Sequence, residues 1–161
     1  ARKEWGFMFY FDEEKKEDPG TWFPFQDSHL DVKAAKYVFD KPGPKAPRFR
    51  FRSPTPFYID RRKKRQRAHE FALNPKTMAM ERVAYFKDLT AEEEQQESDD
   101  MRDYVLTGIE GAVWESKKEI ACTRENKLKL FLNDNFNRFA GRCIAMLSGI
   151  ETDAEERSEK N

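Results

Sequence analysis

Side chains that could carry out catalysis or hold a metal ion are few and scattered in this sequence. The two histidines, His29 and His69, and the two cysteines, Cys122 and Cys143, stand far apart, and no HExxH or CxxC spacing occurs. A zinc site takes three or four such ligands, and none of the seven glycines forms a phosphate-binding or dinucleotide-binding loop. We therefore expect no catalytic residue, no metal site and no cofactor, and we expect that the protein is not an enzyme.

A basic segment, residues 45–67, is the strongest local signal. It contains ten Lys and Arg residues and one Asp, although the whole chain has 30 basic and 30 acidic residues and no net charge. Cations among aromatic rings suit RNA, because phosphates take the charge and unpaired bases stack on rings. Residues 88–103 carry eight acids and one Arg. The two segments could neutralise each other or face different partners, and we favour docking on protein over RNA because of the zero net charge.

Aromatic residues are concentrated in the first 60 residues, which hold 14 of the 22. Five prolines between Pro42 and Pro56 keep this part extended, and aliphatic residues that could fill a core are scarce there. These aromatic side chains are therefore expected to find shelter only on partners, since aromatic residues and Arg predominate at interface hot spots. The expected partner-binding residues are Trp5, Phe7, Phe9, Phe11, Trp22, Phe23, Phe25, Arg48, Phe49, Arg50, Phe51, Arg52, Phe57, Tyr58, Arg61 and Arg62.

Local patterns predict one short helix in residues 1–59 and at most one or two short strands. Residues 5–11 read as an extended segment, and residues 29–38 as a helix that Ser28 caps. In Arg48–Arg52, cations alternate with rings, so a strand there would put the Arg side chains on one face and the two Phe side chains on the other. This part forms an extended N-terminal arm in our prediction.

Residues 60–150 are expected to be helical, and residues 151–161 form a charged tail. Asp60 is the expected cap of a helix over 61–73. Asn74-Pro75 is the expected start of a second helix over 75–87, with Asn74 as its cap. A capping box at Thr90–Glu93 begins a long helix that could run to Cys122. A last helix over 125–148 carries an apolar stripe, and it would pack against the preceding helix as a hairpin. The predicted fold is mainly α.

These features predict a non-catalytic structural or accessory subunit that staples its neighbours in a large multiprotein complex, of the organellar respiratory or photosynthetic kind. The alternative is an organellar ribosomal protein that binds rRNA through residues 45–67, and an enzyme comes third. The cysteine pattern fits a reducing compartment, and the start at Ala1 is compatible with a processed mitochondrial or plastid protein. No apolar run reaches the ~18–20 residues that a membrane span needs, so we expect membrane association only through partners.

Overall fold

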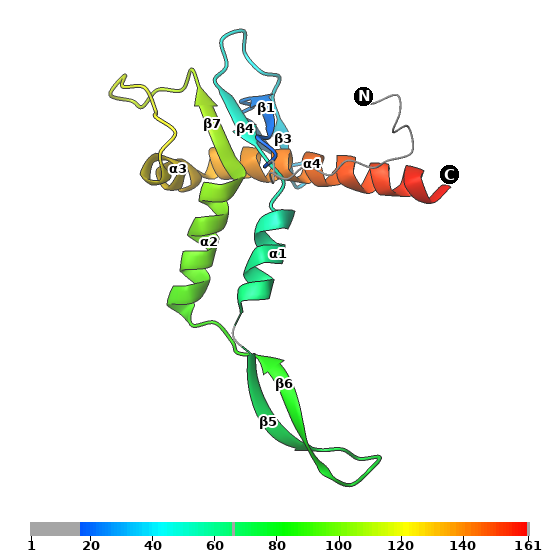
Figure 1. Cartoon of the computed structure of the whole chain (residues 1–161). Coiled ribbons are helices and arrows are strands. Elements are labelled where there is room, and N and C mark those ends of the chain that lie inside the picture. Colours follow the sequence, from blue (N-terminus) through cyan, green and yellow to red (C-terminus); the bar gives the residue numbers. More distant parts are fainter. Residues whose placement is uncertain (1–16, 66, 161) are drawn as a thin grey trace, which may run out of the picture.

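The structure, a computed structural model, describes residues 17–65 and 67–160, with side chains described as far as Gly149. It has four helices (37% helical) and seven strands (28%) in three antiparallel sheets, so the protein is a mixed α/β protein. The prediction of a mainly α fold is wrong. Figure 1 shows a body, built around a sheet and the long helix α4, from which α1, α2 and a hairpin project. The predicted extended segment at residues 5–11 lies outside the described residues.

The body is built around a sheet of three strands, β1 (Thr21–Pro24), β4 (Arg48–Phe51) and β7 (Leu106–Glu110), in the order β1-β4-β7. The central strand β4 buries both of its Phe residues and leaves both Arg residues at least partly exposed. The predicted alternation is therefore confirmed. On the outer face, the guanidinium groups of Arg48 and Arg50 lie 5.1 and 5.2 Å from the ring of Trp22.

An aromatic core fills the space between this sheet and α4 (Asp134–Lys160). The Phe49 ring lies 5.0 Å from that of Phe136, and the Phe51 ring lies 5.9 Å from that of Phe139. Phe25, which follows β1, completes the cluster at 5.1 Å from Phe139. The first 60 residues thus bury part of their aromatic side chains in this chain's own core, and the expectation that only partners could shelter them does not hold for these rings.

The helix predicted over residues 29–38 is wrong, because this segment is a hairpin of β2 (Ser28–Asp31) and β3 (Lys36–Phe39). The carboxylate of Asp31 accepts hydrogen bonds from the backbone N–H groups of Lys33 and Ala34. A short polar side chain can cap a turn in the same way as it caps a helix. The reversal is completed by Ala35, whose φ of 53° is left-handed.

The two helices predicted over 61–73 and 75–87 are also wrong. Helix α1 (Thr55–Lys64) begins earlier than expected, and a second hairpin follows, formed by β5 (Arg67–Leu73) and β6 (Met80–Phe86). The Oδ1 atom of Asn74 accepts a hydrogen bond from the backbone N–H of Lys76 at 2.9 Å. The expected helix cap is therefore a turn cap, for the same reason as at Asp31.

The capping box at Thr90 is confirmed, and helix α2 (Ala91–Val105) begins there. It ends at β7 instead of running to Cys122, because Leu106 and the residues after it pair with β4. The last predicted helix is two helices, α3 (Arg124–Phe131) and α4, which extends past Gly149. Since α4 packs on the sheet, the predicted helical hairpin is wrong. Within the described residues, no helix has the length and hydropathy that a bilayer span requires.

Candidate functional site

Residues 52–105 form one long excursion, which we call the projection, between two neighbouring strands of the sheet. Phe51, the last residue of β4, pairs with Leu106, the first residue of β7. Between them the chain runs out along α1, turns back through β5 and β6, and returns along α2 (Figure 1). Helices α1 and α2 form the stalk of this projection, and residues 67–86 form its tip hairpin. The projection is thus held at both of its ends by the sheet.

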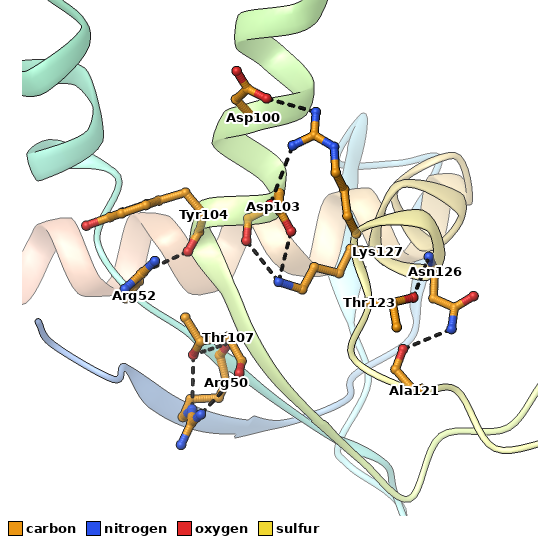
Figure 2. A network of polar contacts seen from close by, with 11 residues as sticks. Arg50, Arg52, Asp100, Asp103, Tyr104, Thr107, Ala121, Thr123, Asn126 and Lys127 are labelled. Atoms are coloured by element: carbon orange, nitrogen blue, oxygen red, sulfur yellow. Dashed lines mark hydrogen bonds and ion pairs between the residues drawn. The ribbon is translucent and has the colours of Figure 1, made fainter.

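The base of the projection is fixed by Arg52. Its backbone N–H donates to the carbonyl of Val105 at 2.9 Å, and its Nε donates to the carbonyl of Tyr104 at 2.7 Å. The guanidinium also lies 3.7 Å from the centre of the Tyr104 ring, where cation–π attraction adds to the hydrogen bond. Figure 2 shows Arg52 reaching across to the end of α2. The first residue of the projection is therefore bound to its last residues.

Ion pairs join the two helices of the stalk. Arg61 of α1 lies 2.6 Å from Asp100 of α2, and Arg65 lies 3.3 Å from Glu97. The basic and acidic segments of the sequence therefore neutralise each other here. Near the base, the ring of Phe57 packs 5.6 Å from that of Tyr104. The two helices of the stalk are thus joined mainly by polar contacts, with one aromatic pair near the base of the projection.

The acidic side of the stalk is also tied to α3. Asp100 lies 2.8 Å from Arg124, and Asp103 lies 3.1 Å from Lys127 (Figure 2). Burial raises the pKa of Asp100, but the hydrogen bond from Arg124 and the charges of Arg61 and Arg124 together hold that pKa below its usual value of 3.8. Asp100 is therefore an ionised hub that joins α1, α2 and α3.

A groove of about 1170 Å³ lies along the stalk and is lined by five basic and five acidic residues. The ion pairs just described, together with those of Arg52 with Glu17 and of Lys64 with Asp60, account for most of these charges, so the groove presents little free charge to a ligand. Among the described residues there is also no cluster of His, Cys, Asp and Glu that could hold a metal ion. Cys143 is buried in the core, which raises the pKa of its thiol to about 12, and this makes it a poor nucleophile.

The tip hairpin has a different character from the rest of the molecule. Its two strands pair over seven residues, from Arg67↔Phe86 to Leu73↔Met80, with no third strand among the described residues. Figure 1 shows it beyond the far ends of α1 and α2, away from the sheet and α4. It exposes large apolar side chains, namely Phe71, Leu73, Met78, Met80, Val83, Tyr85 and Phe86. It is the part of the described chain where such side chains are most concentrated.

The structure separates the sequence-predicted site residues into groups. Those buried in this chain are Phe49, Phe51 and Phe57, and those half-buried include Trp22, Phe23, Phe25, Arg50, Arg52 and Arg61. Arg48 is exposed beside Glu110. Tyr58 and Arg62 are exposed on α1. Trp5, Phe7, Phe9 and Phe11 lie outside the described residues. The prediction that these residues bind partners is therefore untested, although the buried rings have another role.

Sequence reasoning missed the tip hairpin altogether. The signal was one-sided, because β-favouring Val83, Tyr85 and Phe86 follow Asn74-Pro75, a pair typical of turns, whereas only Phe71 precedes it. The same pair also fits the start of a helix, and that interpretation is wrong here.

Comparison with known proteins gives no relative: no family model, no curated protein and no solved structure matches the chain.

Proposed function

We propose that this protein is a non-catalytic structural subunit that attaches to a larger protein assembly through the projection. The observation that carries the proposal is the tip hairpin, which lies beyond the stalk and exposes large apolar side chains from both strands. A two-stranded hairpin on its own is only marginally stable in water, and contiguous exposed apolar surface marks interaction sites. A partner that covers the hairpin would stabilise it and remove the exposed surface.

The body supports this division of roles. Phe51, Val105 and Leu106 in the core of the body are each 0% exposed. The body therefore buries its core with its own side chains and needs none from a partner. Helices α1 and α2 have 10 and 15 residues, which correspond to roughly 15 and 22 Å at 1.5 Å per residue. The stalk therefore holds the tip hairpin away from the body, as an attachment device requires.

A ribosomal role remains the alternative, and it would draw on the basic residues of segment 45–67 that have no ion pair within the described part of the chain, among them Arg62 and Lys63 on the exposed side of α1. Six of the ten cations in that segment are instead engaged inside the chain: Arg48, Arg50, Arg52, Arg61, Lys64 and Arg65. This intramolecular pairing favours the protein assembly over rRNA.

Deletion of the tip hairpin tests the proposal. The variant replaces residues 67–86 by a short Gly-Ser linker, and both forms are tagged and expressed in the native cell. In a sedimentation gradient of a gently prepared extract, we expect the full chain to travel with a large complex and the deletion variant to remain at the top. The variant should keep the thermal unfolding transition of the body, which shows that the loss is not a folding defect.

Equal incorporation of the two forms would rule out attachment through the hairpin. RNase treatment of the same extract separates the alternatives, since an rRNA-bound chain would be released by it. An organellar respiratory or photosynthetic complex stays a prediction, which mass spectrometry of the co-sedimenting subunits tests.

A further inference from the structure

The two faces of the tip hairpin differ in chemistry. Directly opposite residues of an antiparallel pair lie on the same face, and successive residues of one strand alternate between faces. The register pairs Arg67 with Phe86, Phe71 with Arg82 and Leu73 with Met80, so these six side chains share one face. The guanidinium of Arg67 lies 5.4 Å from the centre of the Phe86 ring, as the register requires. We call this surface the basic apolar face.

Large apolar side chains are prominent on the basic apolar face. Phe71 is 71% exposed, Met80 62%, Leu73 54% and Phe86 40%. The opposite face has two large apolar residues, Val83 and Tyr85, with small alanines beside them. Because the gain from burial grows with the apolar area that is removed from water, the basic apolar face has more to gain from a partner.

Charge is also divided between the two faces. Arg67 and Arg82 stand on the basic apolar face together with His69, and of the described strand residues on that face none is acidic. Both carboxylates of the hairpin strands, Glu70 and Glu81, stand on the opposite face. A partner that covers the basic apolar face must therefore offer carboxylates around an apolar centre, because an unpaired buried guanidinium is costly.

We propose that the basic apolar face docks on an acidic, apolar patch of another protein. This deepens the proposed function and rests on it. The end of this face that lies next to the turn favours a protein partner over nucleic acid. Leu73 pairs with Met80 there, and Met78 in the turn is 71% exposed. Aliphatic and thioether side chains fill apolar protein pockets, whereas single-stranded nucleic acid is held by stacking on rings and by cations.

A photo-crosslinking amino acid tests which face is covered and by what. It is placed at Phe71 on the basic apolar face or at Tyr85 on the opposite face, in the full chain expressed in the native cell. After irradiation, mass spectrometry identifies the crosslinked peptides. We expect position 71 to crosslink to one protein, at a peptide that combines Asp or Glu with apolar residues, and position 85 to crosslink much less.

Charge reversal with a matched control gives a second readout that does not require truncation of the apolar side chains. We expect Arg82→Glu to lower incorporation into the complex by roughly tenfold or more, as for a hot-spot residue, and its neighbour Glu81→Lys on the opposite face to have little effect. Reversal of the carboxylate found at the crosslinked site should restore incorporation of the Arg82→Glu variant.

Four outcomes would overturn the inference. They are a crosslink from position 71 to RNA, to a second copy of this chain, or to residues 1–16 of the same chain, and equal effects of the two charge reversals. If deletion of the hairpin abolishes incorporation but Arg82→Glu does not, the proposed function stands and the choice of face is wrong. If deletion has no effect, the proposed function itself fails.

Discussion

The buried position of Phe51 allows a direct test of the fold. Phe51 is 0% exposed, and its ring lies 5.9 Å from Phe139, 6.3 Å from Phe136 and 6.3 Å from Phe23. The change Phe51→Ala therefore removes a ring that joins β1, β4 and α4. If the aromatic residues of the first 60 positions were sheltered only by partners, the same change would hardly affect the isolated chain.

The expected magnitude follows from the burial. A fully buried Phe truncated to Ala loses ~3–5 kcal/mol of the free energy of unfolding, from lost burial and from the cavity that remains. Total stabilities are typically only ~5–15 kcal/mol. For a chain of this size, each kcal/mol lowers the midpoint of thermal unfolding by about 2–4 °C, so we expect the midpoint to fall by about 6–20 °C.

Urea and thermal denaturation of the isolated chain, followed by far-UV circular dichroism, measure this loss. The matched control is Phe71→Ala on the tip hairpin, where the side chain is 71% exposed, and exposed substitutions change stability by no more than about 0.5 kcal/mol. A loss below about 1 kcal/mol for Phe51→Ala, or equal losses for both variants, would refute the aromatic core between the sheet and α4.

Two further predictions concern the ionised hub and the thiols. Asp100→Asn should lower the unfolding midpoint at neutral pH by a few degrees at most, because partly solvated ion pairs contribute up to about 1 kcal/mol each. Since the pKa of Asp100 lies below its unfolded value, the contribution of this carboxylate is complete above pH ~4 and is lost as the pH falls through the folded pKa. Midpoints measured between pH ~5 and ~3 should thus fall more steeply for the wild type than for the variant, and parallel curves would contradict the ion pairs with Arg61 and Arg124. For the cysteines, an Ellman titration at pH ~8 should detect Cys122 at once and Cys143 only after unfolding, because Cys122 is exposed and burial raises the pKa of Cys143 to about 12. Two fast-reacting thiols in the native chain would contradict the packing of Cys143 under the sheet.

Features that depend only on residues a few positions apart could be predicted from the sequence. The capping box at Thr90 and the alternation around Phe49 are both confirmed, because each depends on neighbours a few positions away. The helices predicted over 29–38 and 75–87 are wrong because Asp31 and Asn74 cap turns there, with the same hydrogen bonds that a carboxylate or amide makes when it caps a helix. Only pairing with the partner strand separates the two outcomes, and that pairing is not visible in a local window.

The expectation that only partners could shelter the aromatic side chains of the first 60 residues fails for a related reason. That expectation depends on a segment in which aromatic rings are dense and aliphatic residues are scarce. The aliphatic and aromatic partners that close this core come from distant positions such as Leu106 and Phe139, and a count within one segment cannot include them. The same pairing across the sequence leaves the tip hairpin without cover, since α1 and α2 meet largely through ion pairs such as Arg61–Asp100 and the hairpin extends beyond them. A segment with ordinary aromatic density therefore became the most exposed apolar surface of the described chain, because burial depends on what the fold brings to a side chain and not on how many rings stand beside it in the sequence.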